Sequence, residues 1–373
     1  MSELIPITVA AIVLSILSHR ASEYDPIRCR YGRQDRLWFG IMAVAMILFC
    51  GLRTGYNDTG TYQLIYNAIA KDVDLLEGIN WLKLGENPGF SFTNHVLVRL
   101  GFSTQSFLMF YAVVTVGIYL WFLRKYTCQL PLTVFLFVTF CGYTFTLAAI
   151  KQCMAMALCI VATDRAIKRK YASFILWVLL GALYHPYALM YLLVPLLMFR
   201  PWSGMTLIML AAFAVAGMIM EQLLGTILNV TDMLGENYDA SSFIGEGVNP
   251  FRLAAISVPI LLSFLTRRQI ANENNREQNL MVNLAMLNGE IMFLALFGTA
   301  NYFARLANYF LPFQALAIPW LLSHFEKRSK SLVTTLAIGA YIIFFVYENM
   351  YTGGFDGGYS SVTLWEYLAS VFN

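Results

Sequence analysis

Apolar residues fall in long runs that are separated by short polar connections, and this pattern dominates the chain. The runs approach the roughly 20 residues that an α-helix needs to cross a membrane. They lie at about 3–18, 37–52, 104–123, 131–149, 151–166, 171–184, 187–199, 203–223, 251–266, 279–299, 301–322 and 331–349. Because they lack the ten-residue alternation of a membrane barrel, they predict an all-α bundle. We expect about twelve transmembrane helices, or ten to eleven if pairs such as 171–184 and 187–199 form one bent element.

Composition agrees with this pattern. The 373 residues are 58% hydrophobic and 13% charged, whereas soluble domains carry roughly 25% charged residues. Mean hydropathy is +0.61. The first run has no basic residue before it and has its positive charges after it, which indicates a retained helix rather than a cleaved signal peptide. We therefore expect one integral membrane domain over residues 1–373.

Several kinds of chemistry have no support in the sequence. The six cysteines form no CxxC pair, the four histidines form no HExxH motif, and neither GxxxxGK[ST] nor GxGxxG occurs. Such motifs would mark metal, redox or nucleotide sites. We expect no metal, no cofactor and no nucleic-acid partner, and we interpret the cysteines as apolar packing residues.

Lys and Arg residues indicate the orientation of the bundle. Of the 25 basic residues, 18 lie in alternate connections at 19–36, 124–130, 164–171, 200, 267–278 and 324–330. Cytoplasmic loops carry this excess, so both termini should face outward. The outer connections at 53–103 and 224–250 are then the long ones, and long connections usually serve a site.

The seven remaining cations oppose this bias, and four of them stand at predicted helix ends. Arg53 ends one helix, Lys151 and Arg252 begin two others, and Arg305 lies about one turn into a fourth; His185 occupies an outer turn, "LYHPYA". An arginine at the centre of an apolar helix costs about 2.5–3.5 kcal/mol on insertion scales. The cluster therefore predicts a functional site at the outer face, with Asp58 just beyond Arg53.

Each residue also has a plainer interpretation. Arg53 and Arg252 would serve as interfacial anchors, His185 as a turn residue before Pro186, and Asp58 as the aspartate of an Asx-turn in "YNDTG". The prediction of a site fails only if all of these interpretations are correct at the same time.

A lipid diphosphate at headgroup depth fits the charges best, because guanidinium groups bind phosphate bidentately and lysine adds a compact charge. Arg53, Lys151, Arg252 and Arg305 are the candidates for it. Nearby aromatic residues could stack on the faces of sugar rings, although an aromatic belt at the membrane interface would give the same sequence pattern. Asn301, Arg305 and Asn308 share one helical face, with Tyr309 beside Arg305.

Glu290 is the one acid near the predicted mid-bilayer, with Asn283 and Asn288 on the same run. We favour interhelical hydrogen bonding for it over proton relay.

Five elements, in order, resemble the EpsG-like, Wzy-type polysaccharide polymerases. They are "GLRTGYNDTGTYQLIY" with Arg53, Asp58, Thr59 and Tyr62; "ENPGFSFTNHVLVRLG" with Glu86, Gly89, Phe90 and Asn94; "IKQCMAMAL", with Lys151 where the family has arginine, followed by Gln152; "GALYHPYALMY" with His185; and "FARLANYF" with Arg305 and Tyr309. Tyr184 and Tyr187 also depart from the family pattern. Together the elements span residues 50 to 312 discontinuously.

The resemblance implies a bacterial inner-membrane glycosyltransferase of the GT-C type with its active site facing the periplasm. Such enzymes join undecaprenyl-diphosphate-linked repeat units, as donor and acceptor, in O-antigen or exopolysaccharide synthesis. Membrane lipid, a chain-length regulator and a flippase are the partners that such a system allows. A ligase, another lipid-dependent glycosyltransferase and a flippase for lipid-linked oligosaccharides remain alternatives.

For the reaction we expect the four cations to stabilise the departing diphosphate without a metal. His185 is the first candidate for the general base, since its ordinary pKa lies near neutral pH, and Asp58 is the second. Direct displacement would invert the anomeric centre, whereas double displacement would need Asp58 or Glu86 as nucleophile. The expected sugar-binding residues are Asn57, Tyr62, Glu86, Asn94, Gln152, Asn301 and Tyr309.

Overall fold

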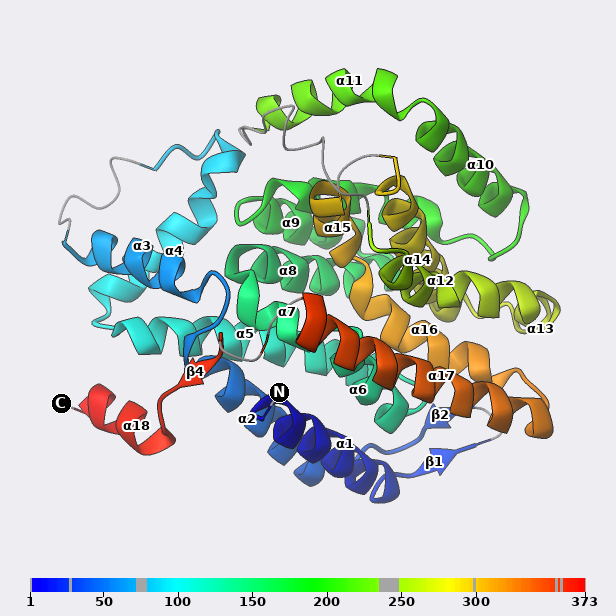
Figure 1. Cartoon of the computed structure of the whole chain (residues 1–373), viewed down its shortest axis with the longest axis horizontal. Coiled ribbons are helices and arrows are strands. Elements are labelled where there is room, and N and C mark those ends of the chain that lie inside the picture. Colours follow the sequence, from blue (N-terminus) through cyan, green and yellow to red (C-terminus); the bar gives the residue numbers. More distant parts are fainter. Residues whose placement is uncertain are drawn as a thin grey trace.

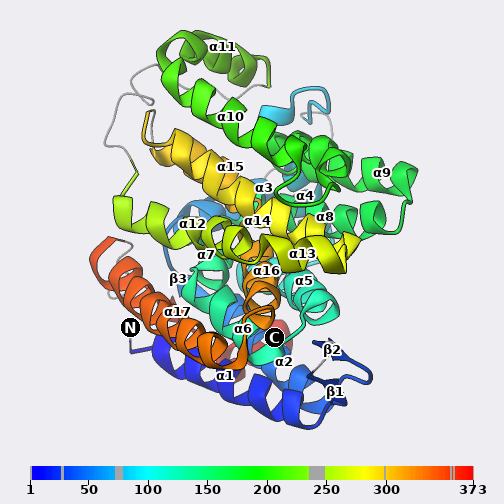
Figure 2. The ribbon, with the colours of Figure 1, turned by 90° about the vertical axis from the view of Figure 1, so that its right-hand side faces the viewer.

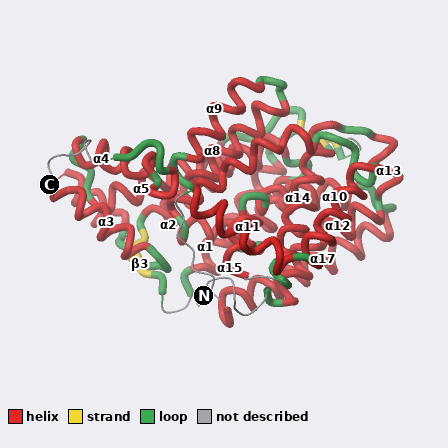
Figure 3. Tube along the Cα trace, turned by 90° about the horizontal axis from the view of Figure 1, so that it is seen from above, coloured by secondary structure: helices red, strands yellow, loops and turns green. Residues whose placement is uncertain are grey.

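The protein is almost entirely helical in the computed structural model, which describes residues 2–26, 29–71, 79–234, 248–297, 300–352, 355 and 358–372 (Figure 1). The segments α3, α4 and α18 lie at the left end of the long axis in Figure 1, and α13 and the β1–β2 hairpin lie towards the right. Figure 3 shows the same separation of α3 and α4 from α13. We call these the outer end and the inner end.

The N-terminal part forms a helical hairpin and continues into a segment at the outer end. Its elements are α1 (Leu4–Arg20), β1 (Tyr24–Asp25), β2 (Arg30–Tyr31), α2 (Leu37–Gly51), β3 (Arg53–Gly55), α3 (Thr59–Lys71), η1 (Leu84–Glu86) and α4 (Pro88–Arg99). Strand β1 pairs antiparallel with β2. Helix α2 packs closely on α5, since a Cβ atom at Gly51 would lie 2.5 Å from Sδ of Met109.

The middle of the chain supplies the central helices. They are α5 (Thr104–Tyr126), α6 (Leu130–Thr139), α7 (Gly142–Ala148), α8 (Ile150–Ile167), α9 (Tyr171–Ala182), the 3₁₀ helix η2 (Pro186–Leu197), α10 (Gly204–Met218) and α11 (Met220–Met233). Helices α10 and α11 form an arm along one side of the bundle (Figures 1 and 2). Residues 224–233 belong to α11, so the outer connection that we expected at 224–250 begins later than predicted; 235–247 lie outside the described residues.

The last part completes the bundle. It consists of α12 (Pro250–Leu265), α13 (Arg267–Glu273), α14 (Arg276–Leu294), α15 (Ala300–Asn308), α16 (Leu311–Ser323), α17 (Lys327–Tyr347), the π-helical turn η4 (Glu348–Thr352), β4 (Ser360–Ser361) and α18 (Leu364–Phe372). Strand β4 pairs antiparallel with β3, joining residues 306 positions apart. Phe355 and Tyr359 continue this contact against Tyr56 and Phe49.

The bundle has the character of a membrane protein. By length and composition, two helices in the described part of the chain are long and apolar enough to cross a membrane: Thr104–Tyr126 and Lys327–Thr352. Two bent helix pairs, Leu130–Thr139 with Gly142–Ala148 and Pro250–Leu265 with Arg267–Glu273, raise the number to four if each pair counts as one span. Six shorter apolar helices accompany them. The all-helical prediction is therefore confirmed, whereas the count of about twelve crossings and the outward termini stay predictions.

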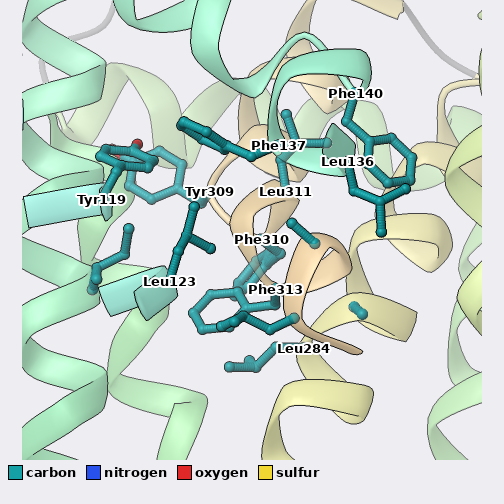
Figure 4. Packing of buried hydrophobic residues seen from close by; sticks show 14 of the residues in the cluster. Tyr119, Leu123, Leu136, Phe137, Phe140, Leu284, Tyr309, Phe310, Leu311 and Phe313 are labelled. Atoms are coloured by element: carbon teal, nitrogen blue, oxygen red, sulfur yellow. The ribbon is translucent and has the colours of Figure 1, made fainter. Parts of the chain in front are cut away.

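Aromatic and aliphatic side chains of α5, α6 and α16 fill the core. Figure 4 shows Tyr119 and Leu123 of α5 near Phe137 of α6 and Phe313 of α16. Because lipid is as apolar as these side chains, packing and interhelical hydrogen bonds hold such helices together.

Three such hydrogen bonds repair the break between α15 and α16. There Tyr309 N donates to Leu306 O and not to Arg305 O, so the regular helical pattern is lost. Side chains from three other elements donate hydrogen bonds to the backbone carbonyl groups around this break. Gln152 of α8 donates to Arg305 O at 2.6 Å, Asn288 of α14 donates to Ala307 O, and Tyr191 of η2 donates to Tyr309 O at 2.6 Å. The break is thereby stable although it lies within the bundle.

The substitution Tyr191→Phe tests this account. It deletes one hydroxyl and leaves the carbonyl of Tyr309 without that donor, so we expect a loss of about 0.5–1.5 kcal/mol in unfolding free energy. Tyr119→Phe is the matched control, since Tyr119 is equally buried but its hydroxyl has no hydrogen-bond partner among the described residues. Denaturant titration in mixed micelles measures both, and equal losses would contradict the account.

Candidate active site

A cavity of about 610 Å³ opens among the elements of the outer end. Its polar wall is formed by eight of the residues singled out in the sequence: Asn57, Asp58, Tyr62, Lys151, Gln152, His185, Arg252 and Arg305. Apolar side chains also line the cavity, among them Phe140, which follows α6, and Phe344 of α17; others come from α12, α14 and α16. Groups from distant parts of the sequence thus share one space.

The turn before α3 contributes Asn57 and Asp58, both exposed to the cavity region. Asn57 adopts a left-handed conformation (φ 46°), which asparagine tolerates better than most residues. One turn further, Tyr62 is nearly buried against Phe90. Burial, with the charge of Asp58, raises the pKa of Tyr62, so its phenol keeps its proton.

Arg53 does not line the cavity. Its side chain is 1% exposed, and its Nε donates to Thr59 Oγ1 at 3.2 Å while another guanidinium nitrogen donates to Cys50 O. Thr59 in turn donates to Tyr56 O at 2.6 Å. Arg53 therefore braces the turn that presents Asn57 and Asp58.

The N-terminus of α8 carries Lys151 and Gln152 into the cavity. Ala149, which precedes this helix, has a non-helical backbone (φ −106°, ψ 74°), so α7 and α8 are separate helices. Lys151 Nζ lies 5.2 Å from the centre of the Phe90 ring. The first turn of a helix also presents backbone N–H groups and a partial positive charge, which adds to the lysine.

A close approach of α4 to the end of α9 brings the histidine turn to the site. Gly89 N donates to Leu183 O at 2.8 Å, and a Cβ atom at Gly89 would lie 2.8 Å from the Leu183 Cβ. Any side chain at Gly89 would push these elements apart. His185 follows two residues after Leu183.

His185 stands at the start of η2 and is 8% exposed. Its Nδ1 lies 3.0 Å from the hydroxyl of Tyr309, and its ring makes an edge contact with Tyr187. Tyr309 is fully buried behind the histidine and does not line the cavity. These contacts fix the orientation of the imidazole ring.

Arg252, in the first turn of α12, forms an ion pair with Glu348. Its Nε lies 3.1 Å from Oε1, and a second guanidinium nitrogen contacts Oε2, to which Thr352 also donates at 3.0 Å. Glu348 is buried and lies in the π-helical turn η4, a type of turn that frequently marks functional sites. The charge of Arg252 is thus balanced, unlike our expectation of four similar cations.

Sequence reasoning missed Glu348, Asn87 and Gly85 as lining residues. Glu348 had a detectable signal, since it stands at the end of the last long apolar run. Asn308, which the helical spacing placed on the same face as Arg305, also lines the cavity. No sequence pattern pointed to Gly85 and Asn87, which line the cavity on either side of Glu86.

Three expected sugar-binding residues, Glu86, Asn94 and Tyr309, do not line the cavity. Glu86 is exposed and pairs with Lys83 at 3.1 Å. Asn94 is fully buried and accepts a hydrogen bond from Tyr111. The side chain of Asn301 lies outside the described residues. No group of three His, Cys, Asp or Glu side chains in the described part of the chain is arranged to hold a metal ion.

A strongly apolar helical chain with a charged cavity at one end defines a helical membrane protein. The EpsG family model matches residues 36–367, so the chain belongs to the EpsG family. Membership indicates a membrane polysaccharide polymerase of the glycosyltransferase kind. In the comparisons with curated proteins and with solved structures, nothing matches.

The Arg252–Glu348 pair should be energetically coupled. Arg252→Met leaves a buried carboxylate without its cation, and we expect a loss of roughly 1–3 kcal/mol in unfolding free energy. In the double variant Arg252→Met/Glu348→Met the loss should be clearly smaller than the sum of the two single losses. Denaturant titration measures all three variants.

The exposed pair Lys83–Glu86 provides the control. Its side chains are 63% and 52% exposed, so Lys83→Met should change stability by less than about 1 kcal/mol. Additive losses at Arg252 and Glu348 would show that the two side chains act independently.

Proposed function

We propose that the protein polymerises oligosaccharide repeat units carried on a lipid diphosphate, transferring a growing chain to a fresh unit at the outer end of the bundle. The observation that carries the proposal is the cavity itself, where Lys151, Arg305 and the N-terminus of α8 face the same space as His185 and Asp58. Membership of the EpsG family supports it.

The membrane arrangement belongs to the same proposal. Ten crossings result when the two bent pairs and the six shorter apolar helices each cross the membrane beside α5 and α17. The expected count of about twelve is reached when α8 and α14 cross as well. With the basic connections on the cytoplasmic side, the outer end faces the periplasm of a bacterial inner membrane. Undecaprenyl diphosphate is the carrier that the resemblance implies, and its headgroup would reach the cavity at interfacial depth.

Lys151 and Arg305 hold the diphosphate in this proposal. Arg305 is exposed to the cavity and Lys151 is half-buried in its wall. Gln152 ties the two positions together through the carbonyl of Arg305. When the bond between the anomeric carbon and the diphosphate oxygen breaks, negative charge grows on that oxygen, and cations already in place stabilise it without reorganisation.

The acceptor hydroxyl attacks the anomeric carbon as this bond breaks, and its proton passes to a base. His185 is our choice, because Tyr309 orients its ring and the cavity reaches it. Asp58, which also lines the cavity, then orients the sugar. Displacement in one step inverts the anomeric centre, which is consistent with a single diphosphate leaving group.

Arg252 and Glu348 form a neutral pair in the lining of the cavity, and we call this pair, together with Phe140 and Phe344, the sugar wall. Aromatic rings and paired polar groups suit the faces and hydroxyls of sugars. We therefore assign this wall to the oligosaccharide rather than to the diphosphate.

Removal of either cation should abolish most activity. For Lys151→Gln and Arg305→Gln we expect turnover of lipid-diphosphate-linked repeat units to fall about 10²–10³-fold. The assay follows longer lipid-linked glycans and released lipid diphosphate with purified protein in nanodiscs. Lys71→Gln and Arg99→Gln, exposed cations that do not line the cavity, are the matched controls and should keep full activity.

Two results would overturn this proposal. One is transfer of labelled lipid between vesicle leaflets with no longer glycan formed, which would indicate a translocase. The other is equal loss in the cavity variants and the controls, which would indicate a general effect of charge.

The base assignment has its own test. His185→Gln should lower kcat about 10²–10⁴-fold with KM nearly unchanged, and Tyr309→Phe should lower it less, because it removes only the group that orients the ring. Asp58→Asn should act mainly on KM. If Asp58→Asn lowers kcat and His185→Gln does not, Asp58 is the base.

A further inference from the structure

A second, larger concavity lies at the inner end of the bundle. It has a volume of about 1200 Å³ and is bordered by the β1–β2 hairpin, the N-terminus of α2 and the C-terminal turn of α5. Figure 2 shows the hairpin at the foot of α1 and α2, well away from α15. The 15 residues of α2 separate this groove from the active-site region by about 22 Å along the helix.

The groove is strongly basic. Arg30, Arg33, Arg36, Arg124 and Lys125 line it, together with the acids Glu23 and Asp35. The carboxylate of Asp35 is occupied, because it accepts hydrogen bonds from the backbone N–H groups of Leu37, Trp38 and Phe39 at the start of α2. Positive charge therefore prevails.

The basic residues fall into two groups. Arg124 is structural: it binds the side chain of Gln34 and backbone oxygens of the hairpin connection. Lys125 pairs with Asp164 of α8. Arg30, Arg33 and Arg36, in contrast, are exposed and make no side-chain hydrogen bond or ion pair with any described residue. These three guanidinium groups remain available to an anion.

The hairpin that carries them is held firmly. The hydroxyl of Tyr31 accepts a hydrogen bond from Leu130 N and contacts His19. Across the hairpin region, Gly32 N donates to Glu23 O at 2.9 Å and Glu23 N donates to Arg33 O at 2.8 Å. A held hairpin means that Arg30 and Arg33 lose little backbone freedom when an anion binds.

Exposed apolar side chains continue from the rim of the groove. Leu37, Ile41 and Val44 of α2 are 65%, 44% and 55% exposed and share one helical face. Trp121, on the rim, is 41% exposed. A phosphate in the groove would thus have its attached chains against this apolar face, and a water-soluble phosphate would leave the face unused.

We propose that the inner groove is a binding site for an anionic phospholipid, whose headgroup phosphate is held by Arg30, Arg33 and Arg36 and whose acyl chains follow α2. Anionic lipids attract basic residues near the membrane surface by about 1 kcal/mol each. The site is independent of the polymerase activity.

Basic inner loops also help to set membrane orientation, and the test must separate the two roles. Orientation depends on total charge near the helix ends, whereas a site depends on where the charges stand. The triple variant Arg30→Gln/Arg33→Gln/Arg36→Gln is therefore compared with Arg268→Gln/Lys327→Gln/Arg328→Gln. The second triple removes the same charge from exposed positions near the inner end that do not line the groove.

Native mass spectrometry of the full chain, exchanged into micelles that hold equal phosphatidylglycerol and phosphatidylcholine, counts the retained lipids. We expect wild-type protein to retain phosphatidylglycerol at least tenfold more than phosphatidylcholine, the groove variant to lose this preference, and the control variant to keep it. Water-soluble glycerophosphate at millimolar concentration should not displace the lipid.

Three outcomes would overturn the proposal. Equal retention of the two lipids by wild-type protein would do so without any variant. Equal loss of the phosphatidylglycerol preference in both triple variants would show that net charge, and not the groove, determines lipid retention. Displacement by glycerophosphate would assign the groove to a soluble phosphate.

Discussion

The hydrogen bond from Gln152 to the carbonyl of Arg305 joins the two helix breaks on which the active-site region depends. In a continuous helix the backbone N–H of Tyr309 would occupy that carbonyl. Because α15 ends at Asn308, the carbonyl needs another donor, and the first turn of α8 supplies it. A buried carbonyl left unpaired in apolar surroundings costs several kcal/mol. The residues that hold the break therefore also set the spacing of Lys151 and Arg305.

Several helices are interrupted beside the cavity. At the outer end, α7 and α8 are separate helices, α15 stops before α16, and α17 passes into the π-helical turn η4. Each interruption points side chains or backbone groups into the cavity. At the inner end, α2 and α5 run to their ends, and the polar residues there lie in the hairpin and short connections. Irregular backbone at these positions is tolerated because it lines a cavity.

Much of this could be predicted from sequence, because charge in an apolar setting is conspicuous. Lys151, Arg252, Arg305 and His185 stood out against the apolar runs, and the structure places them around one cavity. The helical class followed from run length alone. These inferences needed only the local sequence and the general cost of burying charge.

What could not be predicted depends on partners far away in the chain. Arg53 resembles the other outer cations in its local sequence, yet it is buried because Thr59 and the Cys50 carbonyl satisfy it. The pairing of Arg252 with Glu348 joins residues 96 positions apart, so neither residue alone shows that its charge is balanced. The number of helices could not be predicted either, because a break such as that at Ala149 depends on backbone conformation and not on hydropathy.

The pairing of β3 with β4 has a consequence for how the molecule is made. The strand that leads into Asn57 and Asp58 finds its partner 306 positions later, after all the intervening helices have been synthesised. At ordinary translation rates this interval is roughly 15–60 s. During that time Phe49 and Tyr56 lack their contacts with Tyr359 and Phe355. The support for the turn that carries Asn57 and Asp58 is therefore completed late in synthesis, and the nascent chain has no finished site until its last residues are made.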